Sequence, residues 1–300
     1  MERRNLPAII GMPIILLAVI IGGVLLAAPV EDAGLTAFED PDSLTNPIIF
    51  LAILLTFTAV LLLLIRFAKQ QIISLIIGGA ILLTYFYVFL ALSNQFIGSA
   101  TFAATAAFAA AIIAIALLYR YPRWYVIDAL GIILASGVAA IFGASLAVMP
   151  VIILLILLAA YDAISVYRTK HMITLAEGVM DQKMPILFII PKERGYAGTY
   201  EKITPSAESG DIKKERGTFL MGMGDAIMPA ILVVSAYTFI QSPVPAIGAA
   251  IGSFIGLGVL LMMVFSGKPQ AGLPPLNGGV ILGFLAGCLL VSEWSWVFVL

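Results

Sequence analysis

The sequence predicts an all-α membrane protein with nine transmembrane helices, and its composition, its apolar runs and its charge placement all indicate this class. Of the 300 residues, 62% are hydrophobic and only 11% are charged, whereas a soluble domain is about half apolar and about a quarter charged. A helix needs about 20 apolar residues to cross a hydrocarbon core roughly 30 Å thick. The chain holds nine apolar runs of about this length, so we expect one helical unit rather than two domains.

The nine expected spans cover most of the chain and leave one longer polar segment. They comprise residues 7–28, 46–67, 71–92, 100–119, 124–145, 149–167, 217–240, 244–265 and 275–298. Small residues followed by Pro150 separate the fifth span from the sixth and indicate a very short loop. The first run is longer than the about 7–15 apolar residues of a secretory signal, so we expect a retained helix. The expected division is helices 1–6 over residues 1–167, a loop over 168–216 and helices 7–9 over 217–300.

Basic residues mark one side of the predicted bundle. With nine spans, all 16 lysines and arginines lie on the side of the N-terminus, and most belong to the loop 168–216. The first loop on the opposite side is acidic, with Glu31, Asp32, Glu39, Asp40 and Asp42. Because cytoplasmic loops of membrane proteins are enriched in lysine and arginine, we expect the N-terminus and the long loop to be cytoplasmic. The C-terminus is then extracytoplasmic, in a multi-pass protein of the cell membrane.

The long cytoplasmic loop has three sections. Residues 171–183 mix apolar and polar side chains at helical spacing, which predicts a short amphipathic helix on the inner membrane surface. Residues 185–191 are apolar but too few to span the membrane, so we expect a strand or a re-entrant segment. Residues 192–216 are rich in Lys, Glu, Gly and Ser, a composition typical of flexible chain.

Small residues recur in two of the spans. Gly248, Gly252 and Gly256 stand four residues apart in the eighth span, which predicts a face for close helix packing. The fourth span is rich in alanine and is expected to serve packing as well.

Two aspartates lie inside apolar runs, where an ionisable side chain is costly and by default marks function. Asp162 lies about 20 Å from the outer start of the sixth span at a rise of about 1.5 Å per residue. Asp225 lies about 12 Å from the cytoplasmic start of the seventh span, which runs the opposite way. This spacing places both carboxylates at a similar depth. Asp128, near the cytoplasmic end of the fifth span, is expected to be an interfacial residue that meets Arg123 or water.

A close pair of carboxylates has a defined chemistry. The two groups share one proton because both cannot ionise together, so one acts as a base while the other acts as an acid. Such a pair can activate a water against a peptide carbonyl without a nucleophilic side chain. Gly222 and Gly224 leave room beside Asp225 for another backbone or for water, and Tyr161 could offer its hydroxyl. A purely structural aspartate pair is disfavoured, because no lysine or arginine lies inside the spans to pair with it.

These residues resemble the motifs of the presenilin and signal peptide peptidase family, and more narrowly those of the archaeal presenilin homologues. Tyr161 and Asp162 in the sixth span match the family's YD motif. Gly222, Gly224 and Asp225 in the seventh span match its GxGD motif. The resemblance implies that the two aspartates are catalytic and that the other three residues shape the site or bind the substrate.

The family's third motif, PAL, falls on Pro274, Pro275 and Leu276 at the start of the ninth span. Proline stands where the motif has alanine, and the resemblance implies that these residues form a further wall of the site. The match covers essentially the whole chain and implies a presenilin-like helical bundle. It also implies an intramembrane aspartyl protease that hydrolyses peptide bonds in transmembrane segments with no metal and no cofactor.

The resemblance further implies that a substrate helix unwinds to expose a peptide bond. We expect the segment 185–191, or the chain before Gly217, to pair with the unwound substrate as an added strand. The expected partners are single-span transmembrane proteins or peptides and the lipid bilayer, with no nucleic acid, and a homo-oligomer is compatible with the sequence. The presenilin-like orientation implies substrates whose N-terminus is outside.

Other classes of protein fit the sequence less well. A zinc protease needs HExxH and a rhomboid-like serine protease needs a membrane histidine, whereas the one histidine is His171 in the long loop. A prepilin-type peptidase shares the GxGD pattern but lacks the YD and PAL companions and the nine spans. A proton-coupled transporter or channel could use the same carboxylates, but a transporter should show repeated halves, and none is visible. A structural membrane scaffold is the remaining alternative.

Overall fold

The computed structural model describes residues 6–67, 70–169, 187–191, 218–265 and 271–297. Within these ranges the chain forms the nine expected α-helices: α1 (Leu6–Asp32), α2 (Asn46–Phe67), α3 (Gln70–Phe96), α4 (Ala100–Arg120), α5 (Trp124–Ser145), α6 (Val148–Ile164), α8 (Met223–Phe239), α9 (Pro243–Phe265) and α10 (Leu273–Val291). The remaining elements are a π-helical turn (Ser165–Thr169), β1 (Leu187–Pro191), β2 (Thr218–Gly222) and a 3-10 turn (Ser295–Val297). The amphipathic helix expected at 171–183 and the flexible chain expected at 192–216 lie outside the described residues.

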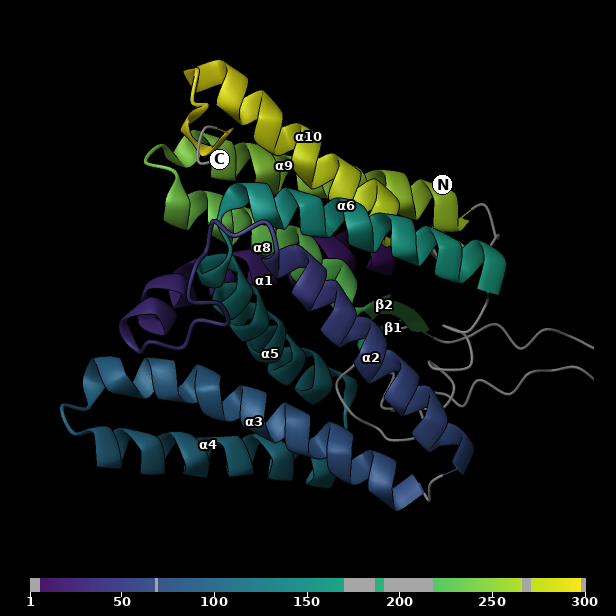
Figure 1. Ribbon diagram of the computed structural model, residues 1–300. Coiled ribbons are helices and arrows are strands. Elements are labelled where there is room, and N and C mark those ends of the chain that lie inside the picture. Colours follow the sequence, from purple (N-terminus) through teal and green to yellow (C-terminus); the bar gives the residue numbers. More distant parts are fainter. Residues whose placement is uncertain (1–5, 68–69, 170–186, 192–217, 266–270, 298–300) are drawn as a thin grey trace, which may run out of the picture.

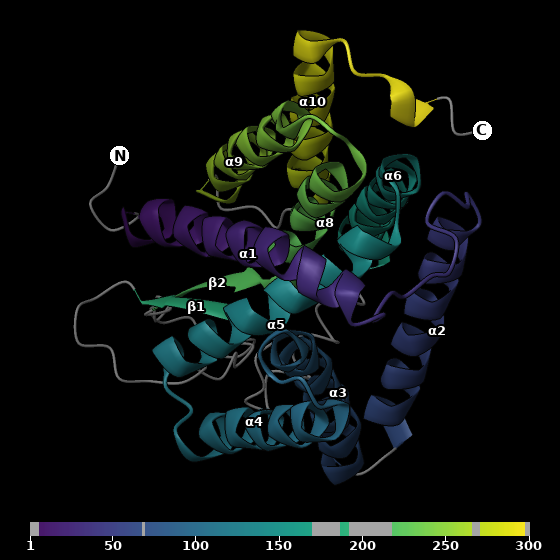
Figure 2. The same ribbon diagram turned by 90° about the vertical axis from the view of Figure 1, so that its left-hand side faces the viewer.

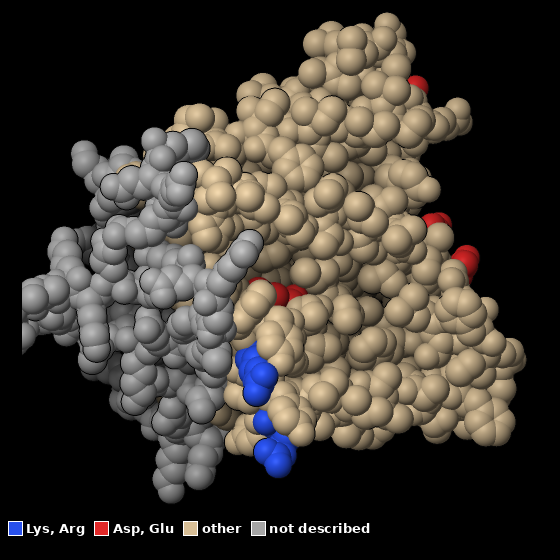
Figure 3. Space-filling view, turned by 180° about the vertical axis from the view of Figure 1, so that it is seen from behind, with Lys and Arg blue, Asp and Glu red and all other residues tan. Residues whose placement is uncertain are grey.

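Judged by length and composition, seven of these helices are long and apolar enough to cross a membrane. The apolar stretches found in the other two, 46–61 in α2 and 223–239 in α8, are shorter. Large apolar side chains such as Leu25, Leu75 and Phe102 are exposed on the helix surfaces. Figure 3 shows that charged side chains occupy only small parts of the described surface. Such a surface suits lipid, because acyl chains are as apolar as leucine.

Helix α8 lies in the middle of the bundle (Figures 1 and 2). It contacts α1, α5, α6, α9 and α10. Helices α9 and α10 pack side by side at one edge, and α3 and α4 form a pair at the opposite edge. Helix α2 stands at the periphery and contacts α6 and α3. The residues at the start of α8 are therefore surrounded by several helices that are distant in sequence.

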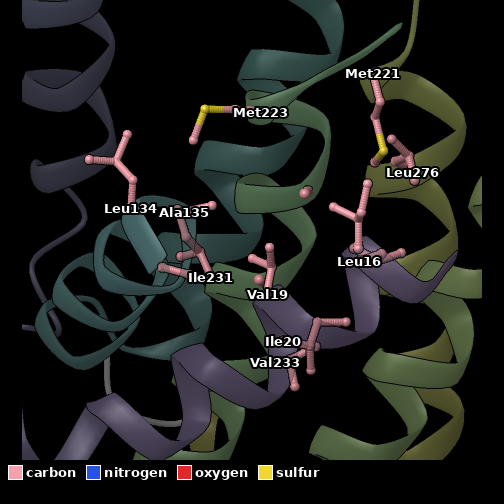
Figure 4. Packing of buried hydrophobic residues seen from close by; sticks show 14 of the residues in the cluster. Leu16, Val19, Ile20, Leu134, Ala135, Met221, Met223, Ile231, Val233 and Leu276 are labelled. Carbon is pink, nitrogen blue, oxygen red and sulfur yellow. The ribbon is translucent and has the colours of Figure 1, made fainter. Parts of the chain in front are cut away.

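Apolar side chains from α1, α5, α8 and α10 form one core. Figure 4 shows Val19 of α1 near Ile231 of α8, and Leu16 of α1 near Met221 of β2 and Leu276 of α10, all within the same buried cluster. This packing holds the end of β2 and the start of α10 against α1. The core thus reaches the two segments that carry the GxGD and PAL motifs.

The segment 185–191 contains a strand, which is one of the two conformations expected for it. β1 pairs antiparallel with β2, with Ile189 opposite Leu220, and β1 also contacts α5 and α1. The prediction that a helix begins near residue 217 is wrong, because the residues of β2 are extended and paired with β1. Helix α8 begins only at Met223.

The last helix also differs from its expected range of 275–298. It begins at Leu273, because prolines fit the first turn of a helix, where the N–H groups have no partner within the helix. It ends at Val291, where Ser292 takes a left-handed conformation with φ of 53°. The prediction that this helix continues to residue 298 is therefore wrong, and a short 3-10 turn follows instead.

The very short connection expected between the fifth and sixth spans is confirmed. Helix α5 ends at Ser145 and α6 begins at Val148. The hydroxyl of Ser235 on α8 donates to the carbonyl oxygen of Leu146 across 2.7 Å. This buried bond fixes the connection to the central helix, at the end of α8 remote from Asp225.

The glycine face predicted in the eighth span is confirmed, and it packs against a second glycine face on α10. A Cβ added at Gly252 would collide with the carbonyl oxygen of Gly279, and one added at Gly256 would collide with that of Pro275. The two helix backbones are therefore in direct contact. This contact extends to the first turn of α10, where the PAL-like residues lie.

Candidate active site

Asp162 lies near the end of α6 and faces the start of α10. Its side chain is only 6% exposed, and its Oδ2 accepts the backbone N–H of Leu273 across 3.0 Å. The backbone of Gly272 supplies a further hydrogen bond to the same carboxylate. The first turn of a helix has N–H groups without helical partners, so the start of α10 is a natural anchor for an anion.

Asp225 lies in the first turn of α8, three residues after the N-cap Gly222. Its carboxylate accepts a backbone hydrogen bond from Gly222. This arrangement is one half of a capping box, in which an acidic side chain of the first turn reaches back to the N–H of the N-cap residue. The extended conformation of Gly222, with φ −62° and ψ 137°, ends β2 and starts α8.

The two carboxylates converge on one stretch of backbone at the start of α10. A Cβ added at Gly272 would lie 2.8 Å from Oδ1 and 3.1 Å from Cγ of Asp225. The carboxyl group of Asp225 therefore lies close to the Cα of Gly272, where a side chain would otherwise stand. Asp162 is bonded to the same backbone, and the charges of the two aspartates interact. The sequence prediction that the two aspartates meet agrees with this geometry.

Asp225 lies nearer the start of its helix than the sequence predicted, and that prediction is wrong. It placed Asp225 about 12 Å inside the seventh span, whereas the residue belongs to the first turn of α8. The difference has a physical cause: residues 218–222 pair with β1 as a strand and do not form the first turns of a helix. The aspartates meet because α10 brings its first turn to both of them.

The other residues of the first two motifs surround this pair. Gly224 is exposed, and a Cβ added there would meet no described residue within 4 Å, so the described part of the chain leaves space beside Asp225. A Cβ at Gly222 would lie 3.2 Å from Oδ2 of Asp225, and the absence of a side chain thus lets the carboxyl group approach. The hydroxyl of Tyr161 shares a hydrogen bond with Thr58 of α2 and is thereby held toward that helix.

The PAL-like residues form the first turn of α10. Pro274 and Pro275 follow Leu273, at positions where the missing N–H of proline breaks no helical bond, so the proline in place of alanine leaves the helix start intact. Leu276 is completely buried and belongs to the main core. This leucine anchors the turn from which Leu273 reaches Asp162.

Two contacts at the site were not anticipated. Gly272 has no signal in the sequence beyond its place before the two prolines. Asn277 is a lone amide in an apolar span, which could have marked it: its Nδ2 donates to the carbonyl oxygen of Leu155 on α6 across 2.9 Å. This bond joins α10 to the helix that carries Asp162. The Oδ1 of Asn277 is buried and has no hydrogen-bond partner within the described ranges of the chain.

The expectation that Asp128 is an interfacial residue meeting Arg123 or water is wrong. Asp128 is only 8% exposed, and its Oδ1 accepts the backbone N–H of Ile189 on β1 across 2.8 Å. Arg123 instead donates to the hydroxyl of Tyr125. The sequence could not show this pairing, because the two partners are 61 residues apart.

Among the described residues, no group of three or more histidine, cysteine, aspartate or glutamate side chains could hold a metal ion. The arrangement that remains is two carboxyl groups beside one backbone segment and an open space at Gly224. Carboxyl groups arranged in this way can transfer protons to and from a water molecule and a peptide bond.

Comparisons with known proteins agree with this reading. The family model described as "Signal-peptide peptidase, presenilin aspartyl protease" matches residues 12–292. A solved structure of a presenilin family intramembrane aspartate protease in space group C222 is 46% identical, covers 93% of this chain and 98% of its own, and has a TM-score of 0.69. A structure with the same description in space group P2 is 48% identical, covers 94% and 97%, and has a TM-score of 0.70. A search of curated proteins found no match.

The family match spans nearly the whole chain, and the likeness to the solved structures extends over the bundle. The expected all-α membrane protein with a presenilin-like bundle is thereby confirmed, and the chain is an integral multi-pass membrane protein. It belongs to the signal-peptide peptidase and presenilin family of intramembrane aspartyl proteases.

Proposed function

We propose that Asp162 and Asp225 are the catalytic pair with which this protease hydrolyses peptide bonds in transmembrane segments. The observation that carries the proposal is their convergence on the backbone of Gly272 and Leu273. The two side chains come from different helices, yet one short segment positions both. Nothing in the comparisons favours the alternative of a proton-coupled transporter or channel.

The pair acts by sharing one proton. Two adjacent carboxylates cannot both ionise, so one stays protonated while the other is a base. The ionised group takes a proton from a water, which attacks the peptide carbonyl carbon. The protonated group donates to the carbonyl oxygen, and a proton then passes to the leaving amine as the C–N bond breaks. The backbone N–H groups of α10 and β2 hold the carboxyl groups in place throughout.

The outer edge of β2 is the place where an unwound substrate would pair. Residues opposite each other in an antiparallel ladder alternate between bonding to each other and pointing both backbone groups outward. The N–H of Ile189 bonds to Asp128 and so points away from β2. Its opposite residue Leu220 therefore points its own N–H outward and can offer it to a substrate. The N–H of Gly222, two residues further on, points the same way and donates to Asp225. A substrate strand added at that edge would lie beside Asp225.

The edge of β2 differs from both segments expected to receive the substrate, 185–191 and the chain before Gly217, because β2 covers Thr218–Gly222. Residues 192–217 lie outside the described residues. The outer edge of β1 is already occupied at Ile189 by Asp128. The outer edge of β2 leads directly to Gly222 and Asp225. We therefore infer that the substrate strand pairs with the outer edge of β2, while β1 pairs with the opposite edge of β2.

We also infer that the N-terminus is cytoplasmic and the C-terminus extracytoplasmic, in a protein of the cell membrane that cleaves single-span substrates. Figure 3 supports this: the blue side chains lie beside the grey atoms, whereas the only charged side chains seen at the right-hand edge of the described surface are red. In intact cells, Asp42→Cys should react with a membrane-impermeant thiol reagent and Glu208→Cys should not. The reverse pattern would refute the orientation.

The catalytic proposal is tested by replacing each aspartate in turn. In liposomes with a single-span substrate, Asp162→Asn and Asp225→Asn should each lower the cleavage rate by about 10²-fold or more, the typical contribution of a general acid or base. Asp32→Asn, at an exposed position at the end of α1, is the matched control and should cleave normally. Cleavage by both Asp162→Asn and Asp225→Asn would show that these two aspartates, the proposed catalytic dyad, are wrongly assigned. A proton-transport assay in the same liposomes tests the rival class, and a chelator should leave cleavage unchanged.

A further inference from the structure

Asp128 is a buried carboxylate that the proposed chemistry does not use. It lies in the second turn of α5, and only 8% of its surface is exposed. Burying a carboxylate is costly unless it is hydrogen-bonded. Among the described residues, its hydrogen-bond partner is the backbone N–H of Ile189, across 2.8 Å.

This bond closes the outer edge of β1. An edge strand carries backbone groups that lack a partner in the sheet, and a buried N–H without a partner is costly. Ile189 is completely buried, so the carboxylate of Asp128 satisfies an N–H that water does not reach. A helix side chain thus stands where the next strand of the sheet would be.

The contact fixes the strand along its own direction. Apolar packing also joins β1 to α5, because Phe188 lies against Gly131, where an added Cβ would be 3.0 Å from the phenylalanine ring. Packing of this kind is non-directional and permits small shifts. A hydrogen bond weakens steeply as its angle departs from linear, and the bond from Ile189 to Asp128 therefore selects one position of the strand.

The position of β1 is transmitted to the dyad in two steps. Ile189 lies opposite Leu220 in β2, and β2 ends at Gly222, the N-cap of α8. Gly222 in turn gives the backbone hydrogen bond that Asp225 accepts. The path is short: the residue pairs on either side of Ile189 and Leu220 hydrogen-bond β1 to β2, and the chain from Leu220 to Gly222 is continuous. Movement of β1 would therefore move the edge of β2 at which we place the substrate.

We propose that Asp128 is a positioning residue, which ties the β1–β2 sheet to α5 and thereby fixes which substrate peptide bond reaches the dyad. The proposal rests on the function proposed above, in which Asp162 and Asp225 cleave a strand added to β2. Without the hydrogen bond from Ile189 to Asp128, the sheet can shift, and the substrate strand then takes several positions along its own direction relative to Asp225. Cleavage is then slower and falls at more than one peptide bond.

The test compares variants on both sides of the bond in liposomes with a single-span substrate, with product ends identified by mass spectrometry. Asp128→Ala removes the acceptor. Ile189→Pro removes the donor, at a backbone group that does not face β2. Each should lower kcat/KM by roughly tenfold, as expected for loss of one hydrogen bond to a charged group, and should add cleavage at neighbouring peptide bonds. The double variant should do little more than either single one, because both changes remove the same interaction.

Two control variants separate positioning from stability. Asp128→Asn keeps an oxygen that can accept from Ile189 and should restore a single cleavage site. Ser235→Ala removes a buried hydrogen bond at the far end of α8 and should lower Tm without changing the product ends. The ratio of products does not depend on how much enzyme is folded, so partial unfolding of a variant does not obscure the result.

Several outcomes would overturn the proposal. Product ends that stay unchanged in Asp128→Ala and Ile189→Pro, with only the amount of active enzyme reduced, would make the bond merely structural. Failure of both single variants to fold would assign the bond to folding instead of positioning. Both results leave the function of the dyad intact when Asp162→Asn and Asp225→Asn are inactive. Cleavage by those two variants would instead refute the proposed function itself.

Discussion

The backbone N–H of Leu273 donates to Oδ2 of Asp162 across 3.0 Å, which ties the first residue of α10 to a carboxylate on α6. The residue before it, Gly272, faces the carboxyl group of Asp225 on α8. Three helices therefore meet at two consecutive residues. Leu276, completely buried one turn later, holds this junction in the core, so the PAL-like turn acts as the part that aligns the two aspartates.

Gly272→Ala should impair catalysis by crowding Asp225. The backbone of Gly272 is helical, with φ −79° and ψ −40°, and alanine fits it without strain. The new Cβ would lie 2.8 Å from Oδ1 of Asp225 and must displace the carboxyl group. A misplacement of about 1 Å at a reacting group can cost about 10²-fold in rate, and we expect a loss of that order in kcat with a single-span substrate. Gly278→Ala, on α10 with no described residue within 4 Å of the added Cβ, should retain normal activity.

Leu220→Pro should weaken substrate binding at the edge of β2. Proline removes an N–H that points away from β1 and is tolerated at sheet edges, so the pairing with β1 should survive. The loss of one hydrogen bond to the substrate should lower kcat/KM by roughly tenfold. Leu220→Ala, which shortens the side chain and keeps the N–H, is the control. Equal activities of the proline and alanine variants would argue against strand addition at this edge.

Gly252→Ala should destabilise the bundle. The added methyl would press into the carbonyl of Gly279, and a backbone group cannot move aside as a flexible side chain can. Overpacking of this kind typically costs about 1–3 kcal/mol, visible as a lower Tm in detergent. Gly258→Ala is the matched control, because a Cβ at that position of α9 has no neighbour within 4 Å in the part of the chain that the structure describes. A similar Tm for both variants would mean that α9 and α10 adjust freely to each other.

Tyr161→Phe should leave the chemistry nearly intact. The hydroxyl of Tyr161 is bonded to Thr58 on α2, so its removal breaks a contact between α2 and α6. We expect a stability loss of about 0.5–1.5 kcal/mol, typical of one hydrogen bond, and cleavage within about threefold of normal. Thr58→Val should behave alike in both assays. A loss of activity as large as that of Asp162→Asn would place the hydroxyl in the reaction.

Much of the fold could be predicted because the bilayer imposes it locally. Its thickness sets the length of each apolar run, and the nine helices appear near their expected places. The cost of a charge at membrane depth singled out Asp162 and Asp225 before any contact was known. The four-residue glycine spacing likewise predicted a close-packed face on α9, which meets the backbone of α10.

The parts that could not be predicted depend on contacts between distant residues. The run before Met223 is apolar enough for a helix, and only its pairing with β1 makes it a strand. The acceptor for the N–H of Ile189 is a side chain 61 residues away, and composition gives no sign of it.

The sequence alone thus determined the class of the protein, the approximate spans and the choice of the two aspartates. Each follows from the free energy of placing individual side chains in a membrane. Tertiary structure decided where α8 begins and what brings the aspartates together. Both depend on backbone groups, those of β2 and of Gly272–Leu273. Every residue carries such groups, so only the folded arrangement shows which of them bind the carboxylates.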